Sequence, residues 1–184
     1  MESHRKRKVV YNDPGHAHFL TFSCQQRLPL LSKDRPRQWV VHALQDAREK
    51  LDFLIWGYVV MPEHVHLLIC PRRREYKMGH IEAAIKRPVS ARAKQFLIET
   101  EATDWLRRLT VREGDEAAFR FWLPGGGYDE NIWNERPIPE ILDYIHMNPV
   151  RRGLVEHPID WAWSSARFWA GDRGVPLLMD PIDV

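Results

Sequence analysis

The sequence predicts an α+β fold: an antiparallel sheet with two helices on one face and a C-terminal helix on the other. Three observations predict it. Runs of β-branched and aromatic residues alternate with two long segments whose apolar residues recur every three or four positions. Only Pro62-Glu63-His64 separates two of the runs, which is the spacing of a hairpin. A third amphipathic segment follows near the end of the chain.

The first half of the chain supplies three strands and a helix. His18–Cys24 is rich in aromatic and β-branched residues and predicts the first strand. A helix is expected from about Asp34 to Lys50, because apolar residues recur there at helical spacing. Phe53–Met61 and Val65–Cys70 are the two runs of the hairpin and should pair antiparallel.

The second half continues with a helix and a strand. Gly79–Ile98 predicts a helix that kinks or breaks at Pro88, because an interior proline costs about 3 kcal/mol. Residues 100–118 are charged and weakly patterned, and we expect a short helix and a loop there, as a variable insertion. Phe119–Trp122 is the candidate fourth strand, and Tyr128–Trp133 is another extended piece.

A last helix begins near Pro137 and carries Tyr144 and Asn148 four residues apart, on one face. Pro149 disfavours a helical Asn148, so the helix should end or bend there. The order strand, helix, strand, strand, helix, strand is the ferredoxin-like pattern. The predicted organisation is a basic N-terminal arm over residues 1–15, one domain over 16–170 and a tail over 171–184. Within the domain, the aromatic residues after the last helix should pack on its body: Trp161, Trp163 and Phe168.

Composition excludes several classes of protein. The sequence has no apolar run long enough for a membrane span and no signal-peptide pattern at its start. Its two cysteines, Cys24 and Cys70, lack paired spacing, which argues against a disulfide framework or a zinc finger. We therefore expect a cytoplasmic protein. The net charge is only +2, so nucleic-acid binding is indicated by local basic clusters rather than by the overall charge. The basic clusters that can mark phosphate contacts include Arg5, Lys6, Arg7, Lys8, Lys86, Arg87, Arg151 and Arg152.

The most informative stretch is Met61–Ile69, which holds two histidines one residue apart. Side chains alternate faces along a strand, so His64 and His66 should point the same way, while Val65 and Leu67 point into a core. Paired neutral imidazoles are a partial metal site. Asn148 would add an amide oxygen as third ligand, and Tyr144 would stand one turn away, near a metal-bound phosphate. Alternatives remain: His16 and His18 share the same spacing, and His80 or His146 could replace a ligand.

At these residues the chain resembles a known family. Met61–Ile69, together with Tyr144–Val155, closely resembles the motifs of the HUH single-tyrosine transposases, and most of all those associated with repetitive extragenic palindromes. Further likeness lies at Pro14-Gly15, Ile85-Lys86 and two C-terminal segments, so the resemblance spans roughly residues 10–170. Those two segments are Gly127-Tyr128-Asp129 and Trp163–Arg167.

The resemblance implies a ferredoxin-like fold and a Mg²⁺ or Mn²⁺ ion held by His64, His66 and Asn148. It implies that Tyr144 attacks single-stranded DNA beside a hairpin, leaving a 5′-phosphotyrosine and a free 3′-OH. The expected protein is a metal-dependent endonuclease and strand transferase, monomeric or homodimeric and associated with the nucleoid. Pro88, the acidic insertion and the glycine run Gly125-Gly126-Gly127 depart from the family pattern and affect the DNA path more than the chemistry.

Two other functions stay open. The first is a catalytically silent protein that binds hairpin DNA on the same fold. The second is a zinc hydrolase that uses the same histidines, which would want a third His, Cys or carboxylate ligand and a carboxylate base nearby. Glu63 is the candidate base, but on an ideal strand it points to the face opposite His64, which disfavours this interpretation.

Overall fold

The computed structural model describes residues 12–114, 116–125, 127–132 and 138–182. Its strands are β1 (Ala17–Ser23), β2 (Phe53–Val60), β3 (His64–Pro71), β4 (Thr110–Glu113), β5 (Glu116–Phe119) and β6 (Tyr128–Ile132). Its helices are α1 (Asp34–Leu51), α2 (Met78–Glu99), α3 (Thr103–Leu109), α4 (Ile138–His146), α5 (Asn148–Arg151) and α6 (Ala166–Trp169). Two short 3₁₀ turns add η1 (Gln25–Arg27) and η2 (Pro158–Asp160).

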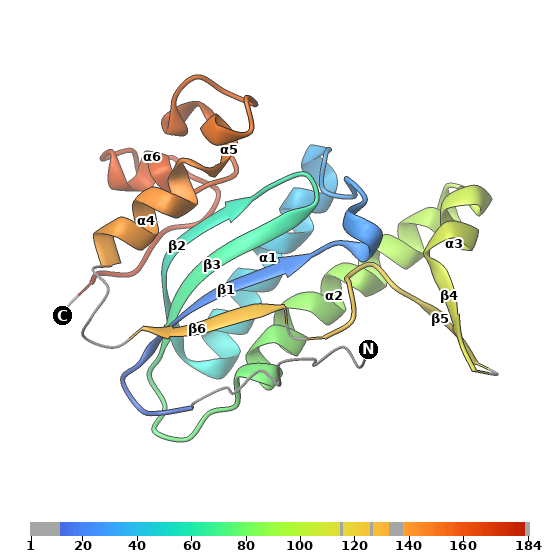
Figure 1. The fold of residues 1–184 in the computed structure, drawn as a ribbon, viewed down its shortest axis with the longest axis horizontal. Coiled ribbons are helices and arrows are strands. Elements are labelled where there is room, and N and C mark those ends of the chain that lie inside the picture. The colour runs from blue at the N-terminus through green and yellow to red at the C-terminus, as the bar shows by residue number, and fades with distance from the viewer. Residues whose placement is uncertain (1–11, 115, 126, 133–137, 183–184) are drawn as a thin grey trace, which may run out of the picture.

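One antiparallel sheet organises the molecule, with the strand order β2-β3-β1-β6. This is the ferredoxin-like order, so the predicted fold class is confirmed. Figure 1 shows α1 and α2 together behind the sheet and α4 on its other side. No helix in the described ranges is long and apolar enough to cross a membrane.

The two faces of the sheet have separate cores, and β3 contributes to both. Val65, Leu67 and Ile69 are fully buried in the core beneath α1 and α2. Leu68 belongs to the smaller core beneath α4, with Val59 and Ile145. The strict alternation along β3 therefore places His64 and His66 on the α4 face, as the sequence predicted.

The fourth strand of the sheet was predicted at the wrong segment. Phe119 ends β5, which pairs only with β4 in a separate hairpin that projects away from the sheet (Figure 1). Trp122 makes a single bridge to Cys24 beyond the end of β1. The true fourth strand is β6, which pairs with β1 from Ala17↔Ile132 to Thr21↔Tyr128. An edge strand is buried less than a central one, so its sequence, YDENI, lacks the apolar signal that favoured Phe119–Trp122.

A kink or a break was expected at Pro88; no break occurs, because α2 is one continuous helix from Met78 to Glu99. Proline removes one helical hydrogen bond and costs about 3 kcal/mol. Ile81, Ile85 and Val89 are buried on one stripe of α2, in the core that α2 shares with α1. Burying each such side chain contributes about 1.5–3 kcal/mol, so the packing of several outweighs the cost of the proline.

The chain after α4 wraps back onto both cores. The helix α4 ends at His146, close to the predicted boundary. Asn148 is nevertheless helical, because a new helix, α5, starts there with Pro149 in its first turn, where proline is tolerated. Trp163 and Phe168 pack on the core under α1 and α2, and Trp161 packs on the other core. In the segment predicted as a tail, Leu177 and Met179 are buried in the larger core, and the Asp180 carboxylate accepts a hydrogen bond from Ile55 N at 2.8 Å.

The approach of the chain to β6 requires glycine at Gly127. Its φ is +67°, and a Cβ there would lie 2.1 Å from the carbonyl oxygen of Thr21. We expect Gly127→Ala to lower the free energy of unfolding by at least about 2 kcal/mol, because both the backbone conformation and the close approach oppose a side chain. Urea denaturation measures this. Gly79→Ala, in a helix with open space at that position, is the control and should change stability by less than about 1 kcal/mol. Equal stability of the two variants would contradict the prediction.

Candidate functional site

A pocket of about 540 Å³ opens on the α4 face of the sheet. It lies beside the first residues of β3, the last residues of β1 and the junction of α4 with α5. Its lining comes from six segments of the chain: Phe19, Thr21, Arg27, His64, His66, Tyr128, Glu130, Tyr144, Asn148 and Arg152. The structure therefore brings His64, His66, Tyr144 and Asn148 together, although up to 84 residues separate them in sequence (148 − 64).

The two imidazoles meet edge to face at the centre of the pocket. His64 Nε2 and His66 Nε2 are 3.1 Å apart, and the ring planes make an angle of 81°. Both rings are buried, and burial lowers both pKa values, that of His66 to about 3. The charge of His64 lowers the pKa of His66 further. Both rings are therefore neutral at pH 7, which is the form that binds metals.

Each imidazole is held by a partner at its other nitrogen. His66 Nδ1 lies 2.7 Å from Thr21 Oγ1, on the neighbouring strand where Thr21 pairs with His66. His64 Nδ1 donates to Glu63 Oε1 at 3.2 Å. A carboxylate can only accept, so the neutral His64 carries its proton on Nδ1 and presents the lone pair of Nε2 to the pocket. The same tautomer at His66 results if Nδ1–H donates to the Thr21 hydroxyl.

These two lone pairs fit a shared cation. Two acceptor nitrogens 3.1 Å apart repel each other unless a positive charge or a proton lies between them. Ligands of one ion with metal–nitrogen bonds of about 2.1 Å stand about 3.0–3.4 Å apart, so the observed separation matches. No cluster of three or more His, Cys, Asp and Glu side chains that could hold a metal occurs within the described ranges. The third protein ligand would therefore come from another residue type, and Asn148 lines the same pocket.

Tyr144 and Asn148 reach the pocket from the end of α4 and the start of α5. The ring of Tyr144 stands 5.5 Å from that of His66 and 5.8 Å from that of Phe19, edge-on to both. It is 37% exposed, and no residue in the described ranges hydrogen-bonds to its hydroxyl. The hydroxyl is thus open to a ligand. Asn148 is buried, and its side-chain amide likewise makes no hydrogen bond to the described part of the chain.

Glu63 corrects an expectation. It precedes β3 rather than lying in it, so strand alternation does not turn it away from His64. Its carboxylate contacts His64 Nδ1 and also accepts from Arg152 Nη1 at 2.9 Å. Glu63 thus joins a predicted phosphate contact, Arg152, to a predicted metal ligand.

The predicted basic residues fall into three groups. Arg152 lines the pocket, and the guanidinium of Arg151 lies 5.2 Å from the centre of the Tyr144 ring, so both are beside the tyrosine. Lys86 and Arg87 do not line it: Lys86 donates to Gly125 O at 3.2 Å, and both belong to α2, behind the sheet. The run Arg5–Lys8 lies outside the described residues.

The alternative histidines are placed elsewhere. His18 is fully buried, and its two ring nitrogens contact Asp129 Oδ1 at 2.9 Å and Tyr76 Oη at 2.8 Å. His146 Nε2 contacts Ser165 Oγ at 2.8 Å, and burial lowers the pKa of its imidazole to about 4. His80 is exposed on α2. None of the three lines the pocket of His64 and His66.

The sequence did not single out five residues that line the pocket: Phe19, Thr21, Arg27, Tyr128 and Glu130. It also assigned the side chain of Glu63 the wrong direction. Thr21 could have been predicted, because it lies on the expected first strand with its side chain on the same face as that of Phe19. Glu63 lies beside His64 in sequence, but its direction depends on the turn before β3. Arg27 follows β1 in η1 at φ +54°, a conformation that no sequence pattern indicated.

The fold has a counterpart among solved transposase structures. The chain has the fold of a solved tyrosine transposase, which is associated with repetitive extragenic palindromes (REP) and is described as bound to a REP hairpin. The TM-score is 0.65 at 24% identity, with 100% of this chain and 91% of that chain covered. In sequence, it is similar to a Haemophilus influenzae protein described as a "Putative REP-associated tyrosine transposase". The two are 25% identical over 155 residues, 82% of this chain and 80% of the relative. No family model matches the chain. These similarities confirm the resemblance found in the motifs.

Proposed function

We propose that this protein is a divalent-metal-dependent transposase that cleaves and rejoins single-stranded DNA beside a hairpin. One observation carries the proposal: a tyrosine with an open hydroxyl shares one pocket with two neutral imidazoles whose Nε2 atoms face each other. The relatives that share the fold and the sequence motifs are named tyrosine transposases, and one of them is described as bound to a hairpin. Both facts support the same substrate class.

His64, His66 and Asn148 are the residues that would hold the ion. Two imidazoles suit Mn²⁺ better than Mg²⁺, which prefers oxygen ligands throughout. When bound, the ion would polarise a phosphate oxygen and stabilise the negative charge that develops on the phosphate. Asn148 supplies a neutral oxygen, so the protein ligands add no negative charge that would repel the DNA.

Tyr144 supplies the nucleophile. Its phenol oxygen forms a bond to the phosphorus as the bond from phosphorus to the 3′ oxygen breaks. The phenol gives up one proton, the leaving 3′ oxygen gains one, and no net water is consumed. The ester bond is kept as a 5′-phosphotyrosine, so a free 3′-OH can reverse the step and seal a strand. A hydrolase would lose that bond to water.

Three arginines surround this step. Arg27 and Arg152 line the pocket, and Arg151 stands over the Tyr144 ring. Guanidinium groups contact phosphate through paired N–H donors, and each contact positions the strand without reading its sequence. Arg152 also binds Glu63, so its side chain is oriented before any DNA arrives. These residues would hold the scissile phosphate opposite the phenol oxygen.

The experiment uses a pool of hairpin oligonucleotides with unpaired, randomised flanks, incubated with the protein and Mn²⁺. We expect a covalent protein–DNA adduct that survives denaturing electrophoresis and disappears when EDTA is added first. Sequencing of the trapped strands gives the cut position. Tight binding of the pool without any adduct would overturn the proposal in favour of a silent hairpin-binding protein.

Thr21 gives a prediction within this proposal. Thr21→Val keeps the shape of the side chain but removes the hydroxyl that orients His66. We expect Mn²⁺ to bind about tenfold more weakly, because loss of a group that orients a metal ligand usually costs 10- to 100-fold in affinity. Titration followed by the electron paramagnetic resonance of free Mn²⁺ measures this. Thr21→Ser, which restores the hydroxyl, is the control and should bind like the native protein. Equal affinity of all three proteins would show that Thr21 does not orient His66.

A further inference from the structure

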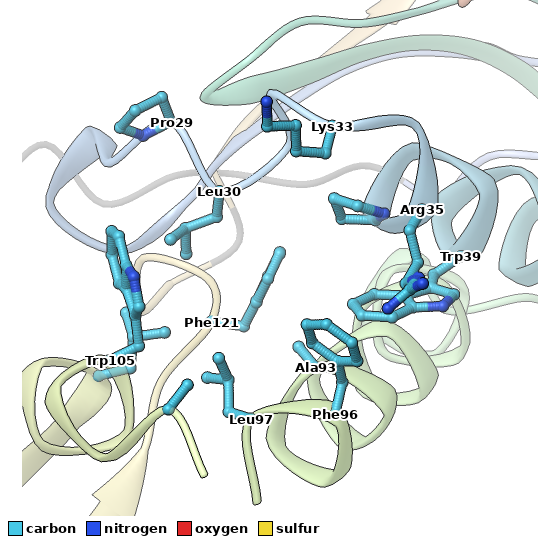
Figure 2. A pocket seen from close by; sticks show the side chains of 13 residues that line it. Pro29, Leu30, Lys33, Arg35, Trp39, Ala93, Phe96, Leu97, Trp105 and Phe121 are labelled. Atoms are coloured by element: carbon cyan, nitrogen blue, oxygen red, sulfur yellow. The ribbon is translucent and has the colours of Figure 1, made fainter. Parts of the chain in front are cut away.

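A second pocket, of about 500 Å³, lies apart from the candidate site and is mainly apolar. It is enclosed by the segment between η1 and α1, the C-terminal half of α2, the helix α3 and Phe121. In Figure 2, Trp105 stands on one side of the opening and Trp39 with Phe96 on the other, and Phe121 lies between them. Phe121 is buried, whereas Trp105 is 40% exposed. The pocket is therefore an aromatic slot whose outer wall faces solvent.

Cations stand at this slot. Lys33 and Arg35 are exposed and line it, and the guanidinium of Arg35 lies 4.6 Å from the centre of the Phe96 ring. Arg108 stands 5.3 Å from the ring of Trp105. The lining contains no acidic residue, and on the neighbouring α3 the carboxylate of Asp104 pairs with Arg107 at 2.7 Å. Flat aromatic faces with positive charges at the opening match an aromatic ring attached to an anionic chain, which describes a nucleotide.

The slot adjoins the candidate site through one short segment of chain. Arg27 lines the transposase pocket, and Pro29 and Lys33 line the slot. Two backbone hydrogen bonds hold this segment against the turn between β2 and β3. Cys24 N donates to Glu63 O at 2.8 Å, and Leu31 N donates to Pro62 O at 2.8 Å. Gln25 N also donates to the carbonyl of Phe121, the residue at the base of the slot. Arg27, Lys33 and Arg35 thus offer phosphate contacts along the way from one pocket to the other.

We propose that the aromatic slot binds an unpaired base of the single strand whose phosphate lies at Tyr144. The inference rests on the proposed function for its substrate class and adds a second binding site on the opposite face of the sheet. The base stacks between the walls formed by Trp105 and Phe96, and its flanking phosphates contact Lys33 and Arg35. Stacking on aromatic faces is tolerant of sequence, so the slot contributes affinity for any unpaired strand and disfavours a duplex, whose bases are already stacked.

The test compares two strands that differ only in their bases. One is a fluorescent oligothymidine of about twelve nucleotides, and the other has the same backbone with abasic sites throughout. We expect the native protein to bind oligothymidine more tightly. Trp105→Ala should weaken that binding about tenfold and leave the affinity for the abasic strand unchanged. Replacing an aromatic residue that stacks on a base by alanine typically lowers the affinity by about this factor or more. Lys33→Gln should weaken the binding of both strands, and the affinity should fall less steeply with salt concentration.

Two variants keep this result interpretable. Trp105→Phe retains an aromatic face and should recover most of the binding, which a general defect in folding would not allow. Trp169→Ala removes a tryptophan of equal exposure, 39%, on α6, and should leave both strands unaffected. Unchanged oligothymidine binding in Trp105→Ala overturns the inference. A change in the oligomeric state of Trp105→Ala, measured by sedimentation, without a change in oligothymidine binding also overturns it. The slot would then be covered by a second copy of the chain.

The outcome separates this inference from the proposed function. If Trp105→Ala binds oligothymidine normally while the native protein still forms the Tyr144 adduct, the slot has no role in binding and the transposase function stands. If base-dependent binding is lost in Trp105→Ala but no adduct forms with any hairpin, the slot binds bases in a protein that does not cut. Each failure therefore has its own signature.

Discussion

We expect Tyr144→Phe to remove the proposed covalent protein–DNA adduct completely, while binding of the hairpin stays within about threefold of the native protein. The change deletes one oxygen atom from a side chain that is partly exposed, and the ring keeps its edge contacts with Phe19 and His66. No other atom of the phenylalanine can attack phosphorus, so the expected loss is total rather than partial. The measurement is the fraction of labelled hairpin that stays with the protein on a denaturing gel.

The control for this prediction is Tyr128→Phe. Tyr128 is the second tyrosine in the same pocket, and its hydroxyl donates to Glu130 at 2.7 Å. That protein should still form the adduct, because Tyr144 remains. An adduct that persists in Tyr144→Phe and vanishes in Tyr128→Phe would identify Tyr128 on β6, and not Tyr144 on α4, as the nucleophile.

If Mn²⁺ binds as proposed, it raises the thermal stability of the native protein, and we expect His66→Ala to abolish that increase. A ligand at about one hundred times its dissociation constant stabilises the native state by about 2.7 kcal/mol, which is several degrees in Tm for a chain of this size. Removing one of two imidazole ligands should weaken binding by more than about 100-fold and eliminate that increase. Differential scanning calorimetry with and without Mn²⁺, and again with EDTA, measures it.

His42→Ala is the matched control, because His42 is exposed on α1, behind the sheet. Its Mn²⁺-dependent increase in Tm should equal that of the native protein. The comparison in EDTA separates loss of metal from loss of fold, since His66→Ala leaves a cavity in the pocket that can lower Tm in the absence of any ion. A Mn²⁺-dependent increase that survives in His66→Ala would remove this residue from the metal site.

The contacts around the imidazoles would prepare the pocket for the proposed metal ion. Thr21 orients one ring and Glu63 orients the other, and Arg152 in turn holds Glu63. Because a carboxylate only accepts, Glu63 fixes the proton of neutral His64 on Nδ1 and its lone pair on Nε2. Thr21 holds the ring of His66, which has the same tautomer when the Thr21 hydroxyl accepts from Nδ1. A site prepared in this way loses little conformational entropy when an ion binds.

Much of this arrangement follows from local sequence. Period-two alternation in β3 is sufficient to place His64 and His66 on one face and Val65 and Leu67 on the other, because side-chain direction along a strand depends only on position. The end of α4 close to Asn148 agrees with the boundary that Pro149 indicated, although Asn148 is itself helical, as the first residue of α5. The motifs around these residues also sufficed to indicate the family that the chain resembles.

Other features depended on contacts between distant segments. The polar segment Tyr128–Ile132 forms the edge strand of the sheet because Gly127 allows the chain to approach Thr21 closely. No local apolar pattern indicates that pairing. The helix α2 remains unbroken at Pro88 because burial against α1 outweighs one lost hydrogen bond.

The sequence by itself thus determined most of the elements, the face on which the histidines stand and the residues that could react. Only the tertiary structure decided which side chains meet: Thr21 beside His66, Glu63 between His64 and Arg152, and Trp105 across a slot from Phe96. The physical reason is that residue spacing fixes direction within one element, whereas the distance between two elements is set by the packing of the cores that separate them.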